Sequence, residues 1–206
     1  MSFHQYHVIS TPAHCFAGNC LSYSMSSQQQ TVLQKAGRLA ALYNAVPNFF
    51  WTILNLTPAV YYFYLYLPLN WLWLIAPLCI LPYCFKPALL DKMVISQSRH
   101  WYHRLGVHRV QQYVQHGVII NRIIRRRYPA YRIVYNKTTI TRKINESYMF
   151  ERFHLGMLLA FAVLTAHALV TRHWQWALLL LLCNILYNAY PILLQQYVRL
   201  RLKRLL

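Results

Sequence analysis

Acidic side chains are almost absent from this sequence, which has only three, Asp91, Glu146 and Glu151, among 206 residues. Lysine and arginine total 21, so the formal net charge at pH 7 is +18. On a soluble protein such a charge would suggest nucleic-acid binding. Here most cations lie between or beside long uncharged stretches, so we attribute the charge to a membrane surface and expect no nucleic-acid partner.

Charge is missing altogether between Arg38 and Lys86. This stretch is long enough for two helical spans, each of which needs about 20 apolar residues. Two further apolar stretches occupy residues 153–171 and 173–195, and 57% of all residues are hydrophobic. That fraction is too high for an ordinary soluble domain. We therefore predict an all-α membrane protein with four transmembrane helices in two hairpins and a basic, interfacial helical segment between the hairpins.

Four segments follow from this pattern. We expect a disordered polar tail at residues 1–34, a first transmembrane hairpin at 35–85, a basic cytoplasmic interfacial region at 86–145, and a second transmembrane hairpin with a basic C-terminus at 146–206. The second span is short and contains Pro77 and Pro82, so it is either kinked or re-entrant. Residues 133–135 form either a short strand or an extended linker.

The cations are distributed unequally between the two ends of the predicted spans. Fourteen lie between residues 86 and 152 and four follow the last span, whereas the two turns at the other end contain only Arg172. The positive-inside rule then places both termini and the basic region in the cytoplasm of a multi-pass cell-membrane protein. The first 34 residues contain no lysine or arginine, so we expect no signal peptide.

Two groups of cations in the basic region suit a membrane surface. Residues 99–104, Arg-His-Trp-Tyr-His-Arg, mix cations with aromatic side chains, as a helix lying on an anionic bilayer requires. Arg125, Arg126 and Arg127 form a cluster suited to phosphate or lipid headgroups. Alternatively, this cluster only fixes the topology and has no ligand. We expect membrane lipid to be a partner in either case.

The five cysteines do not indicate a disulfide framework. Three fall in predicted spans and two in the tail, where a cytoplasmic location keeps thiols reduced. The tail also contains several potential metal ligands, whose spacing matches no strong zinc pattern: His4, His7, His14, Cys15 and Cys20. We assign no metal.

Two of the three acids stand where the chain enters its third predicted span. A carboxylate beside a bilayer is costly unless it has a partner or a task. Glu151 and His154 are three residues apart and so are neighbours on one helix face, and Glu146 lies within about 140° of both. One interpretation is a general base in which Glu151 orients the imidazole. The other is that both glutamates simply pair with Arg142, Arg152 or the basic C-terminus.

A polar stripe runs along the fourth predicted span. Its members fall within an arc of about 60° on an α-helix: Asn184, Asn188, Gln195 and Arg199. Such a stripe faces protein or a water-filled site instead of lipid. In an antiparallel hairpin, Glu151 and His154 lie at the depth of residues 190–195, so they converge with the lower part of the stripe at the cytoplasmic interface. We expect Asn184 only to hold the hairpin together.

Three motifs carry a resemblance to a known family. They are the segment 99–104, a Glu-x4-Glu-x2-His pattern at Glu146, Glu151 and His154, and Asn188 followed by an apolar run and Gln195-Gln-Tyr197-Val-Arg199-Leu-Arg201. Together they resemble the glycosyl-4,4'-diaponeurosporenoate acyltransferases, small membrane enzymes of bacterial carotenoid biosynthesis. The resemblance implies transfer of a fatty acyl group to a sugar hydroxyl of a carotenoid glycoside, an amphiphilic substrate. It implies an acyl donor and no other cofactor.

The resemblance also implies roles for individual residues. The catalytic residues would be His154, Glu151 and Glu146, with His154 taking the proton of the incoming hydroxyl. The substrate-binding residues would be Asn188, Gln195, Tyr197, Arg199 and Arg201, and Asn188 or Gln195 would stabilise the oxyanion.

The alternative is a non-enzymatic membrane scaffold or assembly protein that binds anionic lipid. A Glu151–His154 contact beside a cleft would favour the enzyme, and glutamates closed off by arginines would favour the scaffold. A transporter is disfavoured because the sequence has no inverted repeat.

Overall fold

The computed structural model describes residues 27–110, 118–129 and 137–206, and all regular structure in these ranges is helical. Two long helices, α1 (Ser27–Tyr66) and α7 (Lys137–Val170), are each continuous. A third rod joins α8 (Trp174–Asn184), the π-helix η3 (Ile185–Ala189) and α9 (Tyr190–Lys203). Shorter helices lie between these rods: η1 (Leu69–Trp71), α2 (Leu72–Ile80), η2 (Leu81–Cys84), α3 (Pro87–Lys92), α4 (Arg99–Arg104), α5 (Val107–Val110) and α6 (Val118–Arg127). The predicted all-α class is confirmed for the described part of the chain.

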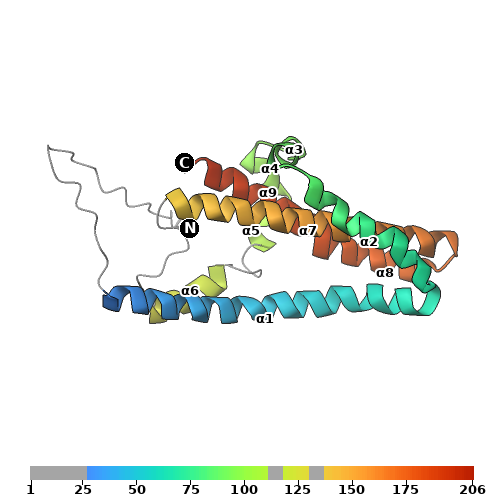
Figure 1. The fold of residues 1–206 in the computed structure, drawn as a ribbon, viewed down its shortest axis with the longest axis horizontal. Coiled ribbons are helices and arrows are strands. Elements are labelled where there is room, and N and C mark those ends of the chain that lie inside the picture. Colours follow the sequence, from blue (N-terminus) through green and yellow to red (C-terminus); the bar gives the residue numbers. More distant parts are fainter. Residues whose placement is uncertain (1–26, 111–117, 130–136) are drawn as a thin grey trace.

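Two of the helices are long and apolar enough to cross a membrane, namely Lys137–Val170 and Trp174–Lys203. They contain the third and fourth predicted spans, and Figure 1 shows them side by side and antiparallel. The first predicted span lies inside the 40-residue α1, which does not meet the same test of hydropathy. The second predicted span corresponds to a shorter apolar segment, Leu69–Cys84. Length and composition therefore support two spans, and the four-span arrangement stays a prediction.

The predicted tail is shorter than expected, because α1 already begins at Ser27 and includes residues 27–34. The rest of the tail, with its histidines and cysteines, lies outside the described residues. So do residues 133–135, for which we expected a strand or a linker.

The two turns of the molecule lie together at one end. The rings of Tyr66 and His173 are 4.2 Å apart between centroids, and those of Trp71 and His167 are 5.3 Å apart. Below these rings a buried core joins α1 to α7 and α8: Ala59, Tyr62, Phe161, Leu164, Ala168, Ala177 and Leu180. α1 and α7 begin, and α9 ends, at the opposite end (Figure 1). The helix ends that carry the basic residues therefore lie on one side of the structure, as the unequal distribution of cations along the sequence predicts.

Gly156 allows α2 to approach α7 closely. A Cβ atom at this position would collide with the backbone carbonyl of Cys79. Glycine and other small residues permit such close contacts between helices where water cannot drive association. This contact ties the first half of the chain to α7 two residues beyond His154.

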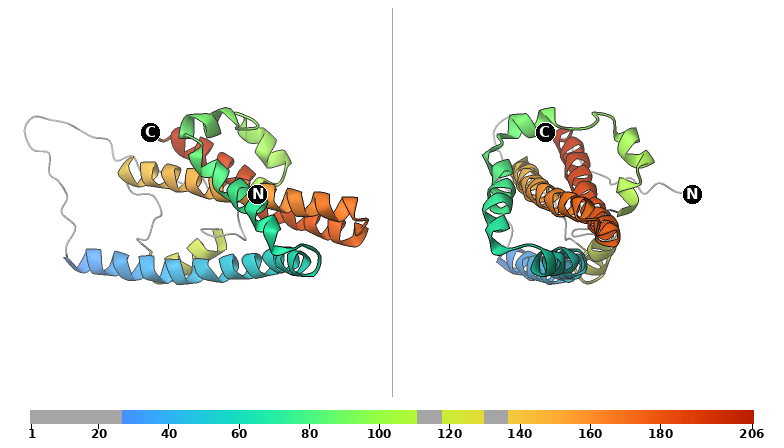
Figure 2. Two further views of the ribbon diagram at one scale, coloured as in Figure 1. Left: turned by 45° about the vertical axis from the view of Figure 1, so that its right-hand side comes forward. Right: turned by 90° about the vertical axis from the view of Figure 1, so that its right-hand side faces the viewer.

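Helices α3 to α5 of the basic region lie beside α9, as the two views in Figure 2 show. Leu90 of α3 packs in one buried cluster with Tyr148 and Leu202, and Tyr102 of α4 packs in another with Tyr197. Residues 99–104 do form a helix, as predicted, but Tyr102 is fully buried on α9. α4 is therefore anchored to protein through one side.

Candidate active site

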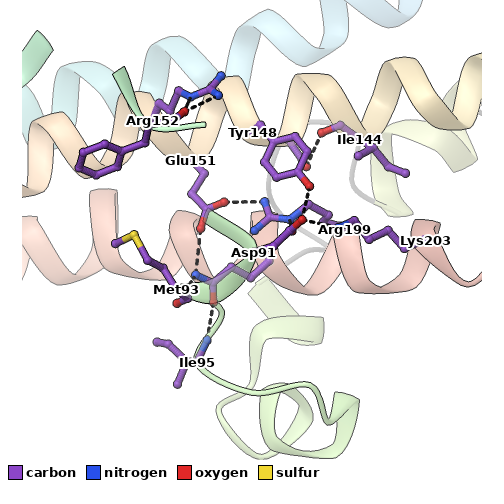
Figure 3. A network of polar contacts seen from close by, with 12 residues as sticks. Asp91, Met93, Ile95, Ile144, Tyr148, Glu151, Arg152, Arg199 and Lys203 are labelled. Atoms are coloured by element: carbon purple, nitrogen blue, oxygen red, sulfur yellow. Dashed lines mark hydrogen bonds and ion pairs between the residues drawn. The ribbon is translucent and has the colours of Figure 1, made fainter. Parts of the chain in front are cut away.

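Glu151 is buried against α9 and is not exposed at the mouth of a cleft. Its side chain is 1% exposed. One carboxylate oxygen accepts a hydrogen bond from Nη1 of Arg199 at 2.5 Å, and the other accepts one from Nε2 of Gln196 at 2.9 Å (Figure 3). A buried carboxylate persists only when it is paired and hydrogen-bonded. Glu151 thus joins α7 to α9.

Arg199 connects this pair to the third acid of the chain. Its Nε lies 3.2 Å from Oδ1 of Asp91 on α3, and its guanidinium stacks over the Tyr148 ring at 4.4 Å. Asp91 also accepts hydrogen bonds from the Tyr148 hydroxyl at 2.8 Å and from Nζ of Lys203 at 2.7 Å (Figure 3). Two carboxylates and two cations form one neutral network, which holds α3, α7 and α9 together.

The surroundings of Asp91 favour its ionised form. Partial burial alone raises the pKa of this carboxyl group. Hydrogen bonds from Lys203 and Tyr148, with the charges of Lys203 and Arg199, outweigh that effect, so the pKa of Asp91 lies below its ordinary value. Asp91 is therefore ionised at neutral pH.

Gln196 fixes the segment between α3 and α4 over the network. Its side-chain oxygen accepts hydrogen bonds from the Tyr102 hydroxyl at 3.1 Å and from the Ile95 backbone N–H at 3.3 Å. Its amide nitrogen donates to Glu151 and to the Met93 carbonyl, the latter at 3.5 Å. Sequence reasoning chose Gln195 instead, which is only half-buried.

The π-helix η3 explains this displacement by one residue. A π-helical turn bonds residue i to i+5 and so accommodates one more residue than an α-helical turn. Beyond η3, Gln196 therefore occupies the face that an uninterrupted α-helix would give to Gln195. The buried stripe of the structure is Asn184, Asn188, Gln196 and Arg199.

The remaining predicted residues lie around the network. Tyr197 is buried, and its hydroxyl lies 3.2 Å from Nε2 of His103 on α4. Arg201 is half-buried on the same helix. Glu146 does not join Glu151, because it pairs with Nζ of Lys143 at 2.5 Å on its own helix.

A shallow, open depression surrounds Glu146 on α7. It is lined by Thr138, Thr141, Arg142, Asn145, Glu146 and Met149. Nowhere in the described ranges do three histidine, cysteine or acidic side chains gather in a way that could hold a metal ion.

His154 has different neighbours from those predicted. The Glu151 carboxylate bonds to Arg199 and Gln196, and within the described residues Nδ1 of His154 is buried with no hydrogen-bond partner. The predicted Glu151–His154 pair is therefore not formed. The imidazole instead lies beside the Asn188 side chain and the Tyr187 backbone, and its ring stands edge-on to the Tyr187 ring, with the two centroids 5.8 Å apart.

Asn188 is fully buried and held in place by a second amide. Its Nδ2 donates to Oδ1 of Asn184 at 2.8 Å, and Nδ2 of Asn184 donates to the Leu158 carbonyl at 3.2 Å. Oδ1 of Asn188 has no hydrogen-bond partner among the described residues. Two neighbouring side chains, His154 and Asn188, thus each present a buried polar atom that the described fold leaves unsatisfied.

The local backbone accounts for this arrangement. Pro191 has no N–H, so the carbonyl of Tyr187 lacks its usual helical donor four residues later. π-Helical turns such as η3 occur frequently at functional sites. The Tyr187 hydroxyl also lies 3.1 Å from Oγ1 of Thr52 on α1. His154 therefore stands where α7 meets the irregular turn that α1 supports.

The family model for glycosyl-4,4'-diaponeurosporenoate acyltransferases matches residues 86–206. The chain belongs to this family. The match extends from α3 to α9 and includes the whole network of Figure 3 as well as His154 and Asn188. No curated protein and no solved structure matches the chain. The resemblance predicted from the three motifs is confirmed, and acyltransferase activity is indicated at the level of the family.

Proposed function

We propose that this protein transfers a fatty acyl group to a sugar hydroxyl of a carotenoid glycoside or a similar glycolipid. Family membership supports acyl transfer. One structural observation supports a site at His154, namely its buried and unsatisfied Nδ1 beside the unsatisfied Oδ1 of Asn188. Buried polar groups without partners are rare in proteins and mark places where a ligand or a functional hydrogen bond belongs.

In this proposal His154 is the general base and Asn188 its positioning residue. As the substrate binds, Nδ1–H of His154 comes to donate to Oδ1 of Asn188, so that the two atoms without partners in this structure satisfy each other and Nε2 stays unprotonated. Nε2 takes the proton of the sugar hydroxyl while the hydroxyl oxygen attacks the acyl carbonyl carbon. The bond from that carbon to the donor's leaving group breaks, and the imidazolium returns the proton to the leaving group.

The Glu151–Arg199 pair has an indirect role in this mechanism. It fixes α7 against α9 one turn before His154, at a point where both partners are 1% exposed. This keeps the imidazole in register with Asn188 across the hairpin. Asn188 thereby takes the orienting role that the sequence pattern assigned to Glu151.

The membrane arrangement belongs to the same proposal. The hairpin of α7 with α8 to α9 crosses the bilayer, the two turns lie on one side, and the basic helix ends and both termini lie in the cytoplasm. The charge distribution and the position of the turns support this orientation (Figure 1). The substrate's apolar part would lie in the bilayer and its sugar at the interface near His154.

A non-enzymatic scaffold is the second candidate, and one observation favours it. Glu146 pairs with Lys143, and Glu151 pairs with Arg199, so cations close off both glutamates. In that case the network would only hold the helices together, and the family's chemistry would be lost in this chain.

Lipid and pigment mass spectrometry separates the two candidates. Cells that make a carotenoid glycoside would be compared with and without the protein. We expect a new species, heavier than the glycoside by one fatty acyl group, only when the protein is present. If the protein inserts normally and no acylated species changes, the enzyme proposal is wrong and the scaffold stands.

A further inference from the structure

Helix α6 has two chemically different faces. Ile120 and Ile124 are buried against Ala36 and Ala40 near the start of α1. Arg122, Arg125 and Arg126 are exposed, and their spacing of three and four residues places them on the face opposite the two isoleucines. α6 is therefore anchored to protein through its isoleucines and presents a row of guanidinium groups outward.

The charges in this row have no acidic side chain to neutralise them. The chain has only three acids. Asp91 and Glu151 are bound to Arg199, and Glu146 is bound to Lys143. All three acids are therefore paired with cations on α7 or α9, and none neutralises an arginine of α6. A row of like charges held together on one helix favours the binding of an anion from outside the protein.

An apolar side chain flanks this row of arginines. Ile123 is 40% exposed although it belongs to the same short helix. Exposed aliphatic groups among cations are typical of helices that bind the interface of a bilayer, where the apolar group enters the acyl region and the cations bind headgroups. α6 also lies at the end of the molecule where α1 and α7 begin and α9 ends (Figure 1).

We propose that the outer face of α6, formed by Arg122, Ile123, Arg125 and Arg126, is a docking surface for the headgroups of anionic phospholipids. Guanidinium groups bind phosphate oxygens through paired hydrogen bonds. The surface fixes the cytoplasmic end of α1 to the bilayer and is independent of acyl transfer.

The test measures lipid binding to the purified full-length protein in a nonionic detergent. Native mass spectrometry would give dissociation constants for phosphatidylglycerol and for phosphatidylcholine with the same acyl chains. We expect phosphatidylglycerol to bind the triple variant R122Q/R125Q/R126Q at least tenfold more weakly than the parent. Phosphatidylcholine binding should not change. The corresponding Arg→Lys triple variant, which keeps the charge, should recover most of the affinity.

The matched control is K86Q/K92Q/R204Q, which removes three exposed cations, one on α3, one just before α3 and one just after α9. Its affinity for phosphatidylglycerol should stay within twofold of the parent value. Equal losses in the two triple variants would mean that net charge alone attracts the lipid, and the proposal would be wrong.

Two further arms separate a lipid surface from a site for free phosphate or for a protein. Ile123→Gln should weaken phosphatidylglycerol binding, and millimolar inorganic phosphate should not displace the lipid from the parent protein. Displacement by phosphate would show that α6 binds the free anion. Unchanged lipid binding in the Arg→Gln triple variant would point to an acidic protein partner or none, and would also overturn the proposal.

Discussion

Glu151 on α7 and Arg199 on α9 form a salt bridge in which each side chain is 1% exposed. These residues stand 48 positions apart, and they connect the two helices that are long and apolar enough to span a membrane. Arg199 is shared with Asp91, so the same guanidinium also holds α3. The pair therefore holds α7 and α9 in the positions that place His154 beside Asn188.

Arg199→Met should be strongly destabilising, because it leaves the buried Glu151 carboxylate without its cation. Removing one partner of a buried ion pair costs about 3–5 kcal/mol. Thermal unfolding in detergent measures the effect. The double variant Glu151→Gln/Arg199→Met should recover part of the loss, and Arg204→Met, at an exposed arginine, should unfold like the parent. An Arg199→Met protein as stable as the parent would show that the bridge is not structural.

Gln196→Leu and Gln195→Leu should differ sharply. The first change leaves Glu151 and the Tyr102 hydroxyl without a hydrogen-bond partner that they have now, at a cost of about 1–3 kcal/mol for a buried group. The second alters a half-buried side chain. Limited proteolysis between α3 and α4 measures the difference, with faster cleavage expected only in Gln196→Leu. Equal cleavage rates would contradict the one-residue shift that we attribute to η3.

Gly156→Val should separate α2 from α7, because the new side chain meets the Cys79 backbone. Overpacking of this kind costs about 1–3 kcal/mol. Gly37→Ala is the matched control, since a Cβ there meets nothing within 4 Å. Its helical position should even stabilise α1 by about 0.5–1 kcal/mol. Melting temperatures of the two variants in detergent should therefore move in opposite directions.

The stabilising effect of Asp91 should disappear in acid. Its folded-state pKa lies below the ordinary value of 3.8, so the folded protein holds this proton less tightly than the unfolded chain does. The contribution to stability is complete above that ordinary value and is lost as the pH falls through the lower folded-state pKa. The melting-temperature difference between the parent and Asp91→Asn should be constant near neutral pH and should shrink below about pH 4. A difference that grows in acid would contradict the direction of the shift.

The helical fold and the family resemblance could be predicted from the sequence alone. The site residues that sequence analysis missed were missed for local structural reasons. Scarcity of acids marked Glu146 and Glu151 as paired or functional, and the same argument applied to Asp91 would have found the second acid of the network. The choice between His154 and Arg199 as partner of Glu151 could not be made from helix periodicity, because both lie within reach of the same helix face. A π-helical turn is not visible in a pattern of polar residues. Because η3 contains one extra residue, the helical periodicity indicated Gln195 where the structure has Gln196.

The most direct test of the proposed site is acyl transfer per molecule of inserted protein in His154→Gln. We expect this variant to accumulate like the parent and to transfer acyl groups about 100- to 10,000-fold more slowly, which is the usual contribution of a general base. His100→Gln, at an exposed histidine of α4, should retain full activity. Full transfer by His154→Gln at normal protein levels would contradict the assignment of His154 as the base.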